Sequence, residues 1–238
     1  MLSRRLCEHL LASVDWRTDP GHAGADLWVV TKALVADARV AQVFLGPRPV
    51  PPEQPPDVSR AIADVLGLVF HEMNTHAPAW QRVQGSRPVA TWGDEHPPPR
   101  PDAGGHEAVP APRPLLETFS LASRELRPLW SAVLPPQTLY ALGRLATEPP
   151  EAFRMPDALW ARIVYDFAVG WRLKVMDRSQ LLRSMTPLYL GWLAGFANEV
   201  GPLAPGEADA RVERLCTAFE LEKRYLITRW RWPDRFSP

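Results

Sequence analysis

The side chains that could carry chemistry in this chain are acids, histidines and arginines, and few of them fall into a recognised pattern. Asp26 follows Gly24 and Ala25 directly before an apolar helical run. His71 and His76 flank Glu72, but their five-residue spacing places them poorly on one helix face, so they are interpreted as core or surface histidines. The sequence has no Walker loop, G-x-G-x-x-G, G-x-S-x-G or H-E-x-x-H motif, and no D-x-D to hold a divalent ion on a diphosphate.

The second half of the chain offers arginines and aromatic residues in helical spacing. Four arginines could face a phosphate-bearing acceptor, although a solvated helix surface is the simpler interpretation: Arg162, Arg172, Arg178 and Arg183. Four tryptophans fall on apolar faces, where core packing is expected and a sugar-stacking platform is the alternative: Trp130, Trp160, Trp171 and Trp192. Tyr165 and Asp166 lie mid-helix and predict a buried polar pair between helices.

Composition excludes several classes of protein. Lys plus Arg and Asp plus Glu each number 27, so the balanced charge does not predict a nucleic-acid partner. Cys7 and Cys216 stand far apart, without C-x-x-C or a Cys/His cluster, and are expected to be free, buried thiols. No secretory signal and no apolar run of about 18 residues is found, so we expect no membrane span and a cytoplasmic location.

The first part of the chain predicts a small amount of α/β structure. Apolar spacing indicates helices over 2–13, 25–37 and 57–76, the last with Asp57 as its N-cap. Alternating apolar residues at 38–46 predict a strand that ends at Gly46 and Pro47. A strand taken from a larger sheet keeps an unpaired edge, so an exposed apolar patch is expected at 25–46.

The remainder predicts an extended connector and then helices. Of 238 residues 27 are proline, more than twice the usual share of about 5%, and many of them cluster in 86–114. Helical periods follow over 115–132, 136–146, 156–176, 178–200 and 206–227, with a kink or restart at Pro187. The expected fold is mainly α: a truncated α/β segment at 1–85, a proline-rich connector at 86–114 and a helical bundle at 115–238.

Three stretches resemble the later part of retaining GT-A glycosyltransferases of the family 2 and 81 type, such as glucosyl-3-phosphoglycerate synthase and mannosylglycerate synthase. One is the run from a helix through a W-x-x-D-like loop and G-x-D to a strand ending in L-G, matched by Gly24, Asp26, Leu45 and Gly46. An S-x-P-V-x-T-[FW]-G pattern is matched by Ser86, Pro88, Val89, Thr91, Trp92 and Gly93. Residues 157–196 resemble the C-terminal helical region.

This resemblance implies a transferase that moves a sugar from a nucleotide donor to a small hydroxylated acceptor such as a glycerate. By resemblance, Asp26 is the catalytic-site acid on the acceptor side, where a helix cap is the alternative role. Gly24 and Arg48 are the implied substrate-binding residues. The intact family uses a divalent metal, Mg or Mn, and the chain alone is expected to bind none.

Two departures from the family pattern indicate which partners the chain would need. Val50 stands about where the relatives carry a metal-binding histidine, and the D-x-D half is missing. A split or incomplete enzyme would therefore need a donor-binding N-terminal half, and would be inactive alone. The alternatives are a non-catalytic regulatory partner of an intact homologue, and a helical interaction module without sugar chemistry. Homo-oligomerisation through the helices is also among the expectations.

Overall fold

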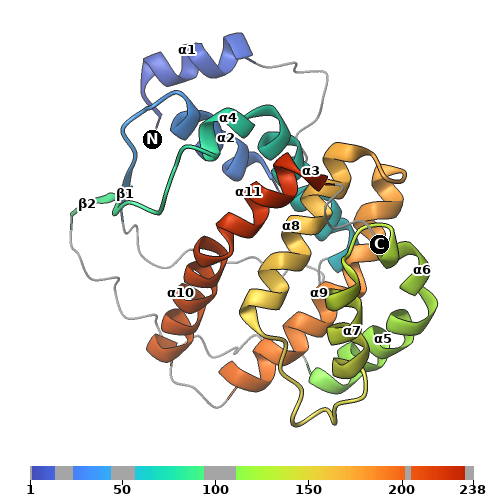
Figure 1. The fold of residues 1–238 in the computed structure, drawn as a ribbon. Coiled ribbons are helices and arrows are strands. Elements are labelled where there is room, and N and C mark those ends of the chain that lie inside the picture. The colour runs from blue at the N-terminus through green and yellow to red at the C-terminus, as the bar shows by residue number, and fades with distance from the viewer. Residues whose placement is uncertain (1, 14–23, 44–56, 94–110, 202–204, 234–238) are drawn as a thin grey trace. The chain divides into compact units, whose positions relative to one another are not determined.

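The computed structural model describes residues 2–13, 24–43, 57–93, 111–201 and 205–233. It divides into two compact units, residues 1–104 and 105–238 (Figure 1). The described residues are mainly helical, with one short parallel sheet, so the mainly α fold expected from the sequence is confirmed. None of the described helices combines the length and apolar character that a bilayer-spanning segment needs.

The first unit contains four helices and two strands within its described residues. In chain order they are α1 (Arg4–Ser13), α2 (Ala25–Val35), β1 (Ala41–Val43), α3 (Val58–Thr75), α4 (Ala77–Trp80) and β2 (Ala90–Trp92). The strands pair in parallel, with Ala41 opposite Ala90 and Val43 opposite Trp92. Parallel strands need a crossover, and here the chain crosses over through α3 and α4.

Local chemistry explains the ends of these elements. Asp57 caps α3 as its sequence predicts, because one carboxylate oxygen accepts hydrogen bonds from the Ser59 and Arg60 amides at 3.0 and 3.2 Å. Gly93, directly after β2, has a φ of +89°, a conformation that residues with a Cβ rarely adopt. The T-W-G part of the resemblance motif therefore forms a strand and the turn that ends it.

The second unit is helical throughout its described residues. It contains α5 (Pro112–Glu125), α6 (Arg127–Ser131), α7 (Pro136–Leu145), α8 (Asp157–Leu173), α9 (Arg178–Val200), α10 (Pro205–Leu221) and α11 (Lys223–Arg231). Helix α5 packs against α9, and α8 contacts α9, α10 and α11. Prolines occupy the first turn of α5, α6 and α7, where a missing backbone N–H costs no helical hydrogen bond.

Helices α5 and α9 approach each other closely within this unit. A Cβ added at Gly191 would lie 2.8 Å from ring carbons of Phe119, so only glycine lets the ring sit against α9. Phe119 is fully buried and meets Phe153 edge to face, with 5.6 Å between ring centroids. Trp130, Trp160 and Trp171 are buried as expected from their apolar faces.

Several elements differ from the sequence-based expectation. The helix expected over 115–132 breaks at Leu126, because Pro128 lacks an N–H and a new helix starts around it. The helix expected over 206–227 breaks at Glu222, whose carboxylate pairs with Arg162 of α8. Helix α9 runs through Pro187 without a restart. Strand β2 lies inside the range 86–114 that was expected to be a connector, and Cys216 is exposed rather than buried.

Candidate functional site

The residues implied by the glycosyltransferase resemblance lie at the start of α2. Gly24 is buried and is the N-cap of this helix, so no side chain caps it. Asp26 is exposed in the first turn, where its negative charge faces the positive end of the helix dipole. Asp26 is thus not the N-cap residue, and its carboxylate is open to a ligand. Arg48 and Val50 lie outside the described residues.

A compact polar cluster joins α2 to α3. The Lys32 ammonium donates to Glu72 Oε1 at 3.1 Å and lies 2.8 Å from Oε2, while His76 Nε2 is 3.1 Å from the ammonium and 3.2 Å from Oε2. The Glu72 side chain is only 6% exposed. A buried carboxylate needs such a partner, because an unpaired buried charge is strongly destabilising. The cluster therefore fixes the helix that carries Asp26 against α3.

Part of this cluster has a sequence signal. Glu72 and His76 are four residues apart on α3, a spacing that places them on one helix face. The sequence pattern singles out His71 and His76 instead and does not indicate Lys32, which lies 40 residues from Glu72. Because the ammonium, the carboxylate and the imidazole all contact one another, the cluster acts as an internal polar network that holds α2 to α3.

The short sheet and α2 expose apolar side chains. Val43 and Trp92 face each other across the strands and are 49% and 68% exposed. On α2, Leu27, Val30 and Leu34 are exposed at i, i+3 and i+7, which makes an apolar stripe on one helix face. The exposed apolar patch expected at 25–46 is therefore present over the described part, 25–43, whereas 44–46 lie outside the described residues. Parallel sheets are normally covered on both faces, so this exposed apolar surface is unusual for a parallel pair of strands.

The second unit holds a fully buried carboxylate, Asp166 of α8. The Tyr225 hydroxyl of α11 donates to it, at 2.8 Å from Oδ1 and 2.9 Å from Oδ2, and Arg229 Nε donates to Oδ1 at 2.7 Å. Burial raises the pKa of Asp166 to about 6, although the charge of Arg229 opposes that shift. Tyr165 lies beside it and donates to the Phe219 carbonyl at 2.7 Å. Both residues thus join helices, as their sequence position predicted.

The four arginines considered as phosphate ligands make separate contacts within the unit. Arg162 pairs with Glu222 at 2.7 Å, and Arg172 donates to the Trp230 carbonyl. Arg178 stacks on the Trp171 ring at 4.4 Å, and Arg183 donates to Ser179 Oγ at 3.0 Å. These separate contacts do not form one anion site.

Aromatic rings form a continuous row on α8 and α9. Trp160 and Trp192 stack with 5.5 Å between centroids and a 15° interplanar angle, and Trp192 also contacts Tyr189 and Phe196. The Trp192 Nε1 atom is buried, and no acceptor for it lies among the described residues. These contacts agree with core packing.

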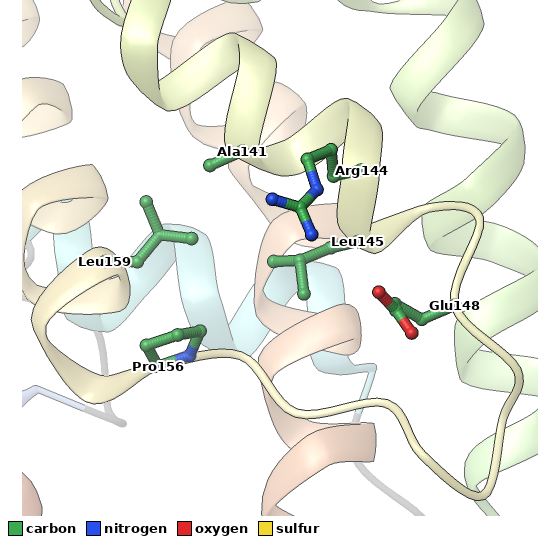
Figure 2. Close-up of a pocket in the computed structure, with 6 residues that line it drawn as sticks. All are labelled: Ala141, Arg144, Leu145, Glu148, Pro156 and Leu159. Carbon is green, nitrogen blue, oxygen red and sulfur yellow. The ribbon is translucent and has the colours of Figure 1, made fainter.

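A small hollow lies between α7 and the start of α8. It has a volume of about 180 Å³ and is bordered by Ala141, Arg144, Leu145, Glu148, Pro156 and Leu159. Figure 2 shows the Arg144 guanidinium beside the apolar side chains, with the Glu148 carboxylate set apart from it. Pockets for small molecules usually measure about 300–1,000 Å³, so this hollow is smaller than a typical ligand site.

Within the described ranges, no three His, Cys, Asp or Glu side chains come together in a way that could hold a metal ion. No family model matches the chain, and neither a curated protein nor a solved structure matches it.

Proposed function

We propose that residues 1–238 form the acceptor-side part of a GT-A-type glycosyltransferase, which transfers a sugar from a nucleotide donor to a small hydroxylated acceptor such as a glycerate. The donor-binding part is supplied by polypeptide outside these residues. The observation that carries the proposal is the uncompleted α/β layer: two parallel strands joined through α3 and α4, with Val43, Trp92 and the α2 stripe exposed. Such a layer gains stability when further strands and helices cover it.

In this proposal, residues at the start of α2 contact the acceptor. The exposed carboxylate of Asp26 accepts a hydrogen bond from an acceptor hydroxyl and orients it toward the donor sugar. Gly24, the buried N-cap, supports the start of α2 that presents Asp26, and the charge of Arg48 suits an acidic acceptor. The protein is proposed to work in the cytoplasm.

The residues present do not fit the divalent metal that the resemblance implies. By the resemblance, Val50 stands about where the relatives carry a metal-binding histidine, and the described residues bring no ligand cluster together. The donor-binding part would therefore have to supply the metal ligands.

Ligand-observed NMR on the purified chain tests the acceptor role. With 3-phosphoglycerate and glycerate as probes, we expect weak binding that Asp26→Asn reduces, whereas UDP-glucose gives no signal. Asp37→Asn is the matched control, because Asp37 is an exposed acid just after the same helix, with a φ of +53° that asparagine also adopts. Absence of binding to both acids, or equal binding by the Asp26→Asn protein, would refute the acceptor role.

A second candidate, a non-catalytic partner of an intact homologue, is favoured by Val50, because a split enzyme would be expected to keep its metal ligand. In that case the uncompleted layer binds the homologue rather than a donor half. Adding the chain to an intact GT-A transferase would then change the turnover of that enzyme. A chain that ignores both the acids and such an enzyme would instead be a helical interaction module.

A further inference from the structure

The end of α8 forms an exposed corner with a strained backbone. Lys174, the residue after the helix, has a φ of 54° and a ψ of 43°, the left-handed conformation that glycine usually supplies at this position. Its amide and that of Val175 close the helix by donating to the carbonyls of Trp171 and Gly170, at 3.3 and 3.2 Å. A residue with a Cβ costs free energy in this conformation. Because a lysine stands where a glycine would be less strained, its ammonium is a candidate for a role outside the fold.

Five exposed basic side chains lie around this corner, at the end of α8, the start of α9 and the end of α11. They are Arg172, Lys174, Arg178, Arg183 and Arg231. Arg172 donates to the Trp230 carbonyl, which joins the end of α8 to the end of α11. Arg178 lies over the Trp171 ring at 4.4 Å, which joins the start of α9 to the end of α8. The three helix ends therefore present their cations together.

These charges are not neutralised by neighbouring acids. Among the described residues, none of Arg172, Lys174, Arg178 and Arg183 forms an ion pair. The acid within this stretch, Asp177, caps α9 by accepting from the Ser179 and Gln180 amides at 3.0 and 3.1 Å. The corner therefore carries an excess of positive charge, although the whole chain is balanced.

Apolar side chains project from the same corner. Leu173 and Val175 flank the strained residue and are 45% and 38% exposed, and Trp232, just after α11, is 61% exposed. The stretch 172–180 is exposed at every residue except Met176, which is half-buried. Aliphatic and tryptophan side chains among cations are typical of surfaces that lie between the headgroups and the acyl chains of a bilayer.

We propose that this basic corner, residues 172–183 with Arg231 and Trp232, binds the surface of an anionic phospholipid bilayer. The cations pair with lipid phosphates and carboxylates, while Leu173, Val175 and Trp232 enter the headgroup region. Separate arginine contacts do not converge on one phosphate, but a bilayer presents many anions, so each cation can meet its own. A nucleic acid offers anions without an apolar layer for the aliphatic side chains, which favours the bilayer. This binding does not depend on the sugar transfer proposed above.

Cosedimentation of the full chain with vesicles tests the charged part of the corner. We expect binding to vesicles of phosphatidylcholine mixed with phosphatidylserine, release by added NaCl, and no binding to phosphatidylcholine alone. Lys174→Gly should weaken binding about fivefold, the effect of one basic residue near an anionic surface, whereas Lys174→Arg should preserve it. Arg214→Gln changes an exposed cation of α10 and is the matched control. No binding to the mixed vesicles, or equal binding by Lys174→Gly and the wild type, would overturn the proposal.

The same glycine variant separates the loss of the ammonium from damage to the fold. Because glycine adopts a positive φ without a Cβ penalty, Lys174→Gly should raise the temperature of thermal unfolding while it weakens vesicle binding.

A second variant tests the apolar part of the corner. Trp232→Ala should lower vesicle binding, whereas Tyr140→Ala, which changes a similarly exposed aromatic residue of α7, should not. Unchanged binding by Trp232→Ala, or tighter binding of polyglutamate or a DNA duplex than of the mixed vesicles, would assign the corner to an acidic macromolecule and refute lipid binding.

Discussion

The two units of the molecule differ in how they use apolar side chains. Among the described residues, the largest fully buried side chains belong to the helical unit, with Phe70 of the first unit as the single exception. The first unit exposes apolar residues on α2 and on both strands, including Leu34 at 60% and Trp92 at 68%, and the helical unit also exposes some, such as Tyr140 at 69%. Among the described residues, the helical unit therefore holds most of the core, while apolar residues of α2 and the two strands are left at the surface.

The polar contacts of the two units differ in the same way. Helices α8 and α11 are joined by Asp166 and Arg229, whose side chains are at most 8% exposed. In the first unit, the joining cation, Lys32, is 13% exposed and His76 is 21% exposed. A buried pair is costly to break, whereas contact with water lessens the loss. The helical unit is therefore held together by more deeply buried polar contacts, and we expect mutations there to have larger effects on stability.

The largest expected effect comes from removing the buried carboxylate. Asp166→Ala leaves the Arg229 charge buried without its anion and should lower the free energy of unfolding by about 3–5 kcal/mol. Urea unfolding followed by tryptophan fluorescence measures this, with Asp209→Ala on exposed α10 as the control. A loss no greater than that of the control would mean that the buried network does not stabilise the helical unit.

Breaking the cluster of the first unit should cost less. Lys32→Met preserves much of the side-chain volume but takes the ammonium away from the Glu72 carboxylate. Because His76 remains as a partner of that carboxylate, the free energy of unfolding should fall by only about 1–3 kcal/mol. Arg60→Met is the matched control, since its partner Asp64 lies 3.9 Å away at the surface. If circular dichroism melting shows equal shifts for both, the contrast between exposed and part-buried pairs in this unit fails.

Features that depend on neighbouring residues were predictable from the sequence, whereas contacts between residues far apart in the chain were not. The Asp57 cap depends on amides two and three residues away, and the helix periods depend on local spacing, so both were predictable. Lys32 and Glu72 are 40 residues apart, and Asp166 and Arg229 are 63 apart. No local pattern links such residues. For the same reason β2 was not identified within 86–114, because a three-residue strand is specified by its partner β1.

Packing between α5 and α9 provides a test of the core itself. Gly191→Ala places a methyl group 2.8 Å from the buried Phe119 ring, and this overpacking should lower the free energy of unfolding by about 1–3 kcal/mol. Gly143→Ala is the control, since its nearest neighbour is the flexible end of Arg127 at 3.7 Å, and alanine there should stabilise helix α7 by about 0.5–1 kcal/mol. Thermal unfolding should thus move in opposite directions, and a shift of the same sign in both would argue against close contact of α5 with α9.

The smallest effect on stability is expected at the exposed stripe of α2, and it separates a bare surface from a covered one. Leu34→Gln changes a side chain that is 60% exposed, so the free energy of unfolding should change by no more than about 0.5 kcal/mol. The same change should lower the fluorescence of an apolar dye such as ANS, because it interrupts the Leu27, Val30 and Leu34 stripe. Leu121→Gln, on an equally exposed leucine of α5, is the matched control. If sedimentation shows that the wild type is a dimer and that, of the two variants, only Leu34→Gln is a monomer, the stripe is covered by a second copy of the chain. In that case the uncompleted layer is closed by self-association rather than by a donor-binding half.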